Sequence, residues 1–324
     1  MAAAAPPRTI AWVGDSYTYF NDLPAMVAAM LETEPDPEAC VLCGGARLSG
    51  HAADPRVAAL LERDWDAVVL QEASTVAGGY DLAKLGASRG AAREFFAPRA
   101  STTLLLFGTW GHRGGSVYGA SKRAYPSYRA MQAKTSAGCK RLCALLGNSA
   151  RYVPVGEAFR EVHEACAGSH LEPEGDPRTL FSRLYAPDGH HPSKLGSYLA
   201  ACVFYATLTG ESPEGHSYRP PPRCAHDDVV QAAFSCLQPG WQPAAMDDGD
   251  RAALQAAAAR ATVYARAQLR RAAGGLEDLD SDEDPDELQL ARELSESYSP
   301  TNSPPRRAPP ESLLRSPSTI RGAR

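Results

Sequence analysis

Long apolar runs are missing from this sequence of 324 residues. The longest candidate, LAACVFYATL at residues 199–208, falls well short of the roughly 20 residues that a membrane-spanning helix needs. The first ten residues, MAAAAPPRTI, contain two prolines and no apolar core behind a basic start, which is unlike a secretory signal. We therefore expect an intracellular protein, most simply a cytoplasmic one, with no membrane partner.

An excess of basic charge is missing as well. Lys and Arg number 33 against 38 Asp and Glu, which gives a formal net charge of -5. Proteins that bind nucleic acids usually carry a basic surface, so we expect no nucleic-acid partner. The hydrophobic share of 44% is ordinary for a globular protein, and the length allows one large domain with a full core.

Cysteines and histidines at the spacing of a metal site are not evident. Cys40 and Cys43 form a C-x-x-C, and Cys139 and Cys143 lie four positions apart, but the two pairs are far apart in the chain. The first pair lies in a strand-like run, whose alternate positions point to opposite faces. We therefore expect buried free thiols, no metal and no organic cofactor. The histidines without ligand spacing are His51, His163, His170, His216 and His226.

Five short apolar runs have the character of β-strands. They span residues 9–14, 40–45, 66–71, 103–109 and 151–156. Each run is continuous rather than alternating, which is typical of strands buried on both faces of a parallel sheet. Helical stretches lie between the runs, at 22–33, 81–96 and 125–146. The alternation predicts an α/β layered fold with right-handed crossovers.

The segment HPSKLGSYLAACVFYATLTG contains the clearest helix. Its apolar residues recur on one helical face, with Pro192 suited to the first turn and Gly210 to the C-terminal cap. That face, which we expect to be buried, comprises Leu195, Tyr198, Leu199, Cys202, Val203 and Ala206.

Composition divides the chain into four parts. Residues 1–7 read as a short flexible N-terminus and residues 8–210 as the α/β domain. Residues 211–275 combine an irregular Pro-rich segment with an Ala-rich helix, which could either pack on the core or stand apart. Residues 276–324 are acidic and then rich in Ser, Pro and Arg, so we expect disorder there. Three serines precede proline and make this tail a candidate kinase target: Ser299, Ser303 and Ser316.

A lone serine follows the first strand-like run, in the stretch TIAWVGDSYTYFND. Ligands of open parallel sheets bind at the carboxyl ends of the strands. Ser16 could therefore be a nucleophile, or only the N-cap of the next helix. A serine nucleophile needs a histidine base, and the histidine needs an acceptor that orients it. APDGHHPS offers both, with His191 three residues after Asp188 and His190 as the rival base.

Other polar and aromatic residues follow the remaining strand-like runs. Gly44 and Gly45 come after the second run, and Gln71 and Glu72 end the third. A further group could line the substrate, although a tryptophan after a strand is as often part of the core. These candidate lining residues are Asn21, Trp110 and His112.

In order along the chain, the motifs GDSYT, FNDLP, GG, DAVVLQEAS, GTW and DGHHPS resemble those of the SGNH hydrolase superfamily, also called GDSL-like esterases and lipases. The resemblance covers about residues 8–210. It implies a flavodoxin-like three-layer αβα sandwich around a five-stranded parallel sheet. It also implies a carboxylic ester hydrolase that needs no cofactor, with Ser16 as nucleophile, His191 as base and Asp188 as the orienting acid.

The same resemblance implies an oxyanion hole with three donors. Two would be the backbone N–H groups of Ser16 and Gly45. The third is usually an asparagine within G-x-N-D, which this sequence lacks, so Gln71 would have to supply the amide. We expect hydrolysis of a small acyl ester, with an O-acetyl group on a carbohydrate as one substrate. The alternative is a weak or inactive module of the same fold that binds a carbohydrate or ester.

Overall fold

The structure, a computed structural model, describes residues 7–96, 102–116, 125–147, 150–168, 173–221 and 245–273, with side chains of the last segment only as far as Val263. Several sequence predictions lie outside the described residues. They are those for residues 1–6, for His170 and His226, for Cys224 and Cys236, for residues 222–244 of the Pro-rich segment, and for the tail at 276–324 with its serines.

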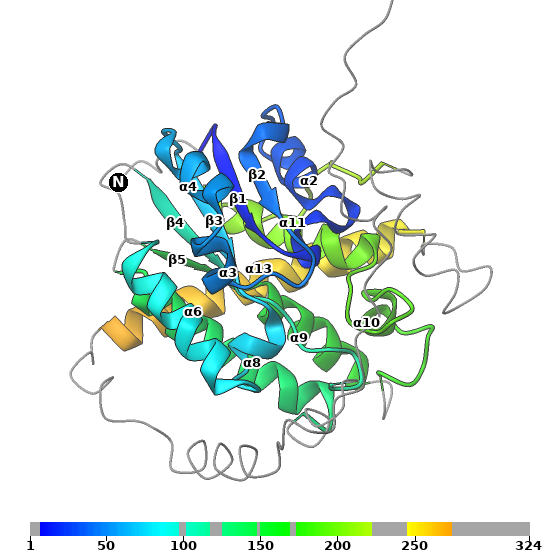
Figure 1. Cartoon of the computed structure of the whole chain (residues 1–324). Coiled ribbons are helices and arrows are strands. Elements are labelled where there is room, and N and C mark those ends of the chain that lie inside the picture. Colours follow the sequence, from blue (N-terminus) through cyan, green and yellow to red (C-terminus); the bar gives the residue numbers. More distant parts are fainter. Residues whose placement is uncertain are drawn as a thin grey trace, which may run out of the picture. The chain divides into compact units, whose positions relative to one another are not determined.

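Five strands form one sheet in the order β2-β1-β3-β4-β5 (Figure 1). They are β1 (Ile10–Gly14), β2 (Cys40–Leu42), β3 (Ala67–Gln71), β4 (Thr103–Phe107) and β5 (Arg151–Val153). All neighbouring pairs are parallel. The predicted α/β fold with a five-stranded parallel sheet is confirmed.

Successive side chains of each strand enter two separate cores, one on each face of the sheet. Val69 of β3 belongs to the first core and its neighbour Val68 to the second. The first core includes α2 (Leu23–Met30), α9 (Val155–Ala167), α11 (Lys194–Thr209) and α13 (Asp248–Ala273). The second includes α4 (Pro55–Glu62), α6 (Leu82–Glu94) and α8 (Tyr128–Leu145). Because helices cover both faces, consecutive residues in the middle of the strands are apolar, and the layers are those of a flavodoxin-like sandwich.

Short helices connect these layers at the ends of the strands. They are α1 (Ser16–Tyr19), η1 (Phe20–Asp22), η2 (Pro37–Ala39), α3 (Leu48–Ala52), α5 (Ser74–Ala77) and α10 (Leu180–Arg183). Three strands end at least two residues before the predicted bound, and one of them is β4, which ends at Phe107 rather than at residue 109. β2 ends at Leu42 because the chain turns through Gly45, whose φ is +67°. β5 ends at Val153 because Pro154 has no N–H to donate and α9 begins directly after it.

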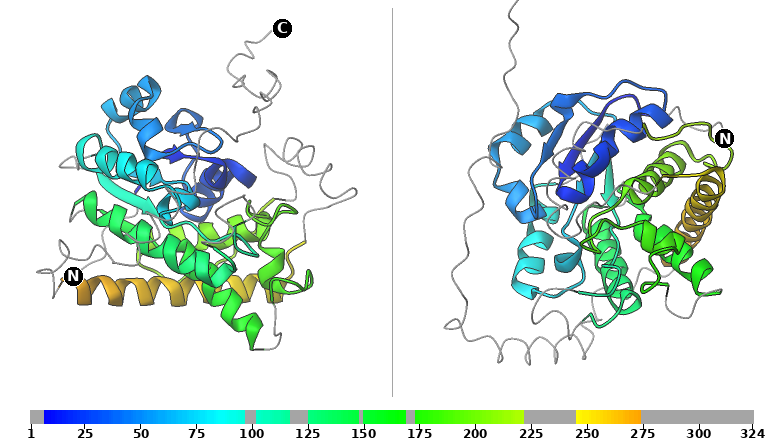
Figure 2. Two further views of the ribbon diagram at one scale, coloured as in Figure 1. Left: turned by 60° about the horizontal axis from the view of Figure 1, so that its bottom comes forward. Right: turned by 90° about the vertical axis from the view of Figure 1, so that its right-hand side faces the viewer.

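The Ala-rich helix α13 packs on the core. In both views of Figure 2 it is one continuous yellow-to-orange helix, and it contacts α11 and α9. Its buried apolar residues are Leu254, Ala257, Ala258 and Ala261. This contact explains why α11 is buried on almost all sides, whereas its sequence predicted a single buried face.

Polar contacts fix α13 near its N-terminus. Asp250 accepts two hydrogen bonds from the Arg183 guanidinium, at 2.8 and 2.6 Å. Gln255 donates to the Tyr198 hydroxyl at 2.9 Å and accepts from the N–H of Gly215 at 3.0 Å. Arg183 is the last residue of α10, which leads into the loop that contains Asp188 and His191. The helix therefore supports the segment that enters this loop.

Thiols of the described residues form no disulfide and are mostly withdrawn from solvent. Cys139, Cys143 and Cys202 are buried and Cys40 is half-buried. Burial raises the pKa of each of these thiols to about 12. Such thiols stay protonated at neutral pH and are poor nucleophiles and metal ligands. Among the described helices, none has the length and apolar character required to cross a membrane.

Candidate active site

Ser16 lies where the strand order reverses. The chain leaves β1 for β2 on one side and later returns to β3 on the other, so the carboxyl ends of β1 and β3 form a topological switch point. Open α/β sheets bind ligands at such points. Ser16 comes two residues after the end of β1, and Gln71 is the last residue of β3.

The backbone around Ser16 forms a capped turn. Asp15 is the N-cap of α1, and its carboxylate accepts from the N–H of Tyr17 at 2.8 Å. Ser16 is the first residue of this helix and is 7% exposed. The cap is therefore Asp15, not the serine. Within the described residues, the Ser16 N–H donates to no other group of the chain, as is usual for a first helical residue.

Three side chains form a chain of hydrogen bonds beside this turn. The Ser16 Oγ lies 2.8 Å from Nε2 of His191. Nδ1 of the same imidazole lies 2.6 Å from Oδ2 of Asp188. An ionised carboxylate can only accept, so the imidazole proton is on Nδ1 and Nε2 is left to accept from the serine hydroxyl.

The loop around Asp188 holds its carboxylate in place. Oδ1 of Asp188 accepts from the backbone N–H groups of His190 and His191, each at 3.0 Å. Gly189 has a φ of +74°, which turns the chain between these residues. Burial alone would raise the pKa of Asp188, but the hydrogen bond from His191 and the two imidazoles together lower it to about 2. Asp188 is therefore ionised at neutral pH.

The Gln71 carboxamide is the centre of a buried network behind the serine. Its Oε1 accepts from the Asp15 N–H at 3.0 Å and from the Thr18 hydroxyl at 2.6 Å. Its Nε2 donates to Oδ1 of Asp15 at 2.6 Å. Gln71 has no exposed surface. One N–H of the Gln71 amide is therefore committed to Asp15, and its oxygen to Asp15 and Thr18.

Gly14 leaves the space that this network occupies. A β-carbon at Gly14 would lie 2.7 Å from both Oε1 of Gln71 and the hydroxyl oxygen of Thr18. Carbon atoms do not approach oxygen atoms so closely without a shift of one of them. The glycine of the GDS stretch is therefore required by the packing behind the serine, independently of any ligand.

Asn21 and Phe20 connect the serine turn to the histidine loop. Nδ2 of Asn21 donates to the carbonyl of Pro192 at 3.1 Å and to the hydroxyl of Ser197 at 2.9 Å. Phe20 stacks on the His191 imidazole with ring centres 4.2 Å apart and planes 8° apart. Asn21 is 4% exposed, and its amide holds the segment that follows His191.

Trp110 lies in the core beneath both loops. It has no exposed surface and stacks between Tyr17 and Phe159, with ring centres 4.5 and 4.4 Å away. Its Nε1 donates to the carbonyl of His190 at 3.1 Å. The structure thus agrees with the core interpretation of this tryptophan, and adds that it ties the histidine loop to the residue after Ser16.

His112 and Gly45 are not part of the chain of hydrogen bonds from Ser16 to Asp188. The first is buried and the second is exposed. His112 is buried, with its ring 5.2 Å from that of His190, and burial lowers its pKa to about 3. It is therefore neutral near pH 7. Gly45 is exposed in the turn after β2, next to β1 in the sheet. It follows the carboxyl end of β2 by three residues.

Glu72 and His51 are buried polar groups that the sequence left without a role. The Glu72 carboxyl accepts from the N–H of Ala73 at 2.8 Å and of Leu48 at 3.3 Å. His51 lies with Nε2 3.0 Å from the carbonyl of Gly14. Both side chains stabilise turns at the carboxyl ends of the strands. No local sequence pattern marks them, because Leu48 and Gly14 come from distant parts of the chain.

Comparisons with known proteins reveal the fold and little more. No family model matches the chain, and no curated protein matches its sequence. Among solved structures, a DUF4886 family protein from Bacteroides uniformis is similar at 20% identity with a TM-score of 0.51, over 79% of this chain and 94% of the other. A candidate GDSL-like lipase from Parabacteroides merdae is similar at 16% identity with a TM-score of 0.40, over 65% of this chain and 99% of the other.

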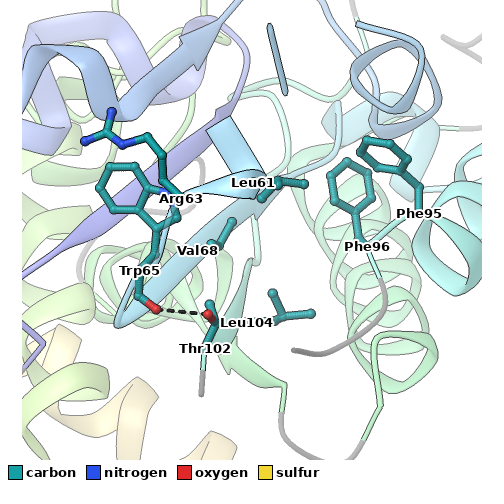
Figure 3. A pocket seen from close by; sticks show the side chains of 8 residues that line it. All are labelled: Leu61, Arg63, Trp65, Val68, Phe95, Phe96, Thr102 and Leu104. Carbon is teal, nitrogen blue, oxygen red and sulfur yellow. Dashed lines mark hydrogen bonds between the residues drawn. The ribbon is translucent and has the colours of Figure 1, made fainter. Parts of the chain in front are cut away.

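A hollow lies at the amino ends of the strands, at the other end of the sheet from Ser16 (Figure 3). Its lining includes Val68 and Leu104, near the amino ends of β3 and β4. The hydroxyl of Thr102 donates to the carbonyl of Trp65 at 2.9 Å beside it. None of Ser16, Asp188 and His191 lines this hollow, so it has no part in the site described above.

Proposed function

We propose that this protein is a serine ester hydrolase in which Ser16 is the nucleophile, His191 the general base and Asp188 the group that orients the base. The chain of hydrogen bonds from Ser16 through His191 to Asp188, at the switch point of the sheet, is the observation that carries this proposal. A serine, a neutral imidazole and an ionised carboxylate in this order are the parts of an acyl-transfer site.

In the first half of the reaction, the Ser16 Oγ attacks the ester carbonyl and its proton passes to Nε2 of His191. The imidazolium that forms is stabilised by Asp188, and it then protonates the leaving alcohol as the carbon–oxygen bond breaks. In the second half, His191 takes a proton from water, and the hydroxide attacks the acyl carbon. Collapse of that intermediate returns the proton to Ser16 and releases the acid.

The oxyanion hole is proposed to consist of backbone donors. The Ser16 N–H is the unused first donor of α1 beside the attacking oxygen, and the Gly45 N–H lies in the turn after β2. Gln71 is proposed to act through Asp15, by fixing the backbone that presents the Ser16 N–H. Donors fixed before the reaction stabilise the oxyanion better than mobile ones.

The acyl group is proposed to be small. Ser16 is only 7% exposed, and the aromatic rings of Tyr17 and Phe20 both pack against His191. An acetyl group fits such closely packed surroundings better than a long chain does. On the alcohol side, we propose a carbohydrate hydroxyl, which sugar acetates and simple alkyl acetates compared at equal concentration would test.

The direct test combines a covalent probe with substitutions. A fluorophosphonate should label the wild-type protein at Ser16, and Ser16→Ala should lose both labelling and turnover of p-nitrophenyl acetate. Ser49→Ala, a half-buried serine outside the site, is the matched control and should keep both. His191→Ala should lose turnover while His190→Gln keeps it. Turnover that survives in Ser16→Ala would exclude the proposal.

The second candidate function is a binding module with little or no turnover. The observation in its favour is that the only side-chain amide at the carboxyl end of β3, that of Gln71, is committed to Asp15 and Thr18. A folded protein that never reacts with the probe, yet retains acetylated sugars on a glycan array, would support this candidate over the esterase.

A further inference from the structure

The loop that presents the proposed base contains a second histidine with no part in the ester chemistry. His190 lies with Nδ1 3.3 Å from Oδ2 of Asp188, the same oxygen that lies 2.6 Å from Nδ1 of His191. A serine hydrolase needs one histidine. Here two imidazoles converge on one carboxylate oxygen, within a turn of four residues.

We infer that Asp188, His190 and His191 form a binding site for a zinc ion, and that zinc bound there inhibits the ester hydrolase. Each of the three residues offers a ligand atom, and these atoms lie within 4.8 Å of one another. Nitrogen of histidine and oxygen of aspartate are common zinc ligands, at about 2.0–2.2 Å. Three protein ligands and one water complete the tetrahedron that zinc prefers.

The distances suit an ion that enters from solvent. Two ligands of a tetrahedral zinc ion lie about 3.4 Å apart when each is about 2.1 Å from the metal. Nδ1 of His190 and Oδ2 of Asp188 already have nearly this separation. Nδ1 of His191 is closer to Oδ2, because a proton joins them, and the pair would open slightly as the ion replaces that proton. The three side chains are 11–19% exposed, so the ion has access.

The loop keeps these ligands together without a metal. The other oxygen of Asp188 is fixed by the backbone N–H groups of His190 and His191. The carbonyl of His190 accepts from Trp110, and the carbonyl of Gly189 accepts from the N–H of Arg113 at 2.7 Å. The backbone that presents the three ligand atoms is therefore held from both sides.

Inhibition follows from the chemistry of imidazole. When zinc binds Nδ1 of His191, that nitrogen gives up its proton to solvent and Nε2 takes one from solvent, so the ring stays neutral with its single proton on Nε2. Nε2 then has no lone pair to accept the proton of the Ser16 hydroxyl, and the oxygen of Asp188 is bound to the metal. The base is lost although every residue stays in place. This part of the inference rests on the proposed function, whereas zinc binding does not.

Binding is tested without any turnover. Metal-free full-length Ser16→Ala protein, titrated with zinc chloride by calorimetry, should bind one zinc ion at this site, and cobalt(II) should give the visible absorption of a four-coordinate ion. Adding His190→Gln should weaken zinc binding at least tenfold, since loss of even an outer partner of a metal ligand typically costs about 10–100-fold. His163→Gln is the matched control, because His163 pairs with Glu174 at 2.9 Å without a second histidine. It should leave the affinity unchanged.

Inhibition is tested on the Ser16 enzyme. Zinc should abolish hydrolysis of p-nitrophenyl acetate, a chelator should restore it, and His190→Gln should shift the inhibitory concentration upward by the same factor as the binding constant. If the Ser16→Ala protein and the Ser16→Ala/His190→Gln protein bound zinc with equal affinity, the proposed zinc site would be overturned. Binding that depends on His190 in a protein without any turnover would support the site and reject only the proposed function.

Discussion

Gln71 and Asp15 are joined by two hydrogen bonds that run in opposite directions. The Asp15 N–H donates to Oε1 of Gln71 at 3.0 Å, and Nε2 of Gln71 donates to Oδ1 of Asp15 at 2.6 Å. Both side chains are buried, and burial raises the pKa of Asp15 although Gln71 and Tyr17 donate to it. The last residue of β3 therefore sets the backbone immediately before Ser16.

Replacing Gln71 by leucine should lower kcat more than it changes KM. The leucine would leave the Asp15 carboxylate and the Thr18 hydroxyl without their buried partner, and the serine turn would shift. Misplacement of a reacting group by about 1 Å can cost roughly 100-fold in rate. We expect a fall in kcat of about 10–100-fold, measured with p-nitrophenyl acetate, and a loss of stability of roughly 1–3 kcal/mol.

Gln132→Leu is the matched control for this change. Gln132 is also a buried amide, which accepts from the N–H of Gly111 at 2.8 Å and donates to Ser136 at 2.8 Å. It should lose similar stability in a urea titration but keep most of its kcat. Equal losses of kcat in the two variants would mean that Gln71 matters for folding alone.

Replacing Trp110 by phenylalanine should loosen the histidine loop. The variant keeps the aromatic stack with Tyr17 and Phe159 but loses the N–H that donates to the carbonyl of His190. We expect a loss of about 1 kcal/mol in stability and a fall in kcat of up to about tenfold. Trp65→Phe is the control, because Trp65 donates to the carbonyl of Leu60 at 2.8 Å. Its kcat should be unaffected, and a similar fall there would argue against a specific role of Trp110.

The sequence was sufficient to predict where the five strands lie and that Ser16, Asp188 and His191 come together. Both depend on local features: continuous apolar runs, and a D-x-x-H spacing at the end of a loop. The role of Gln71 could not be predicted in this way. Its partners Asp15 and Thr18 follow a different strand, and the direction of its amide depends on the register between β1 and β3. The complete burial of the Gln71 side chain likewise depends on how the layers pack together.

The packing of α13 was open from sequence for a related reason. An Ala-rich helix has no strongly apolar face, so its pattern does not reveal whether it is covered. The partner surface decides this, since α11 is buried on almost all sides and α13 packs against it. Trp110 is a similar case, because a tryptophan after a strand is equally compatible with a core position and with a ligand site. Its stacking between Tyr17 and Phe159 identifies it as a core residue, and that stacking could not be read from the sequence.

Asp250→Ala should destabilise the protein more than a charge deletion on the surface does. Asp250 is nearly buried and accepts two hydrogen bonds from Arg183, whereas Asp248 pairs with Arg219 in an exposed position. We expect a loss of about 1–3 kcal/mol for Asp250→Ala and a clearly smaller loss for Asp248→Ala, measured by urea unfolding. Because Arg183 leads into the loop with His191, kcat should fall in the first variant only.

Glu72 should make the stability of the protein depend on pH in an unusual direction. Burial raises the pKa of this carboxyl from 4.5 to about 7, although the N–H groups of Ala73 and Leu48 donate to it. Between these two values the folded protein keeps a proton that the unfolded chain releases. The contribution of Glu72 to stability is therefore complete below about pH 4.5 and is lost as the pH rises through 7.

Glu72→Gln isolates this effect, because glutamine has the shape of the protonated acid and does not titrate. Between pH 5 and 8, the free energy of unfolding of the wild-type protein should fall relative to that of Glu72→Gln by up to roughly 3 kcal/mol. The measurement is urea unfolding at several pH values, with the exposed Glu38→Gln as a control for the loss of one carboxylate from the total charge. A constant difference between wild type and Glu72→Gln across this range would mean that Glu72 is ionised in the folded protein. The two backbone donors would then outweigh its burial.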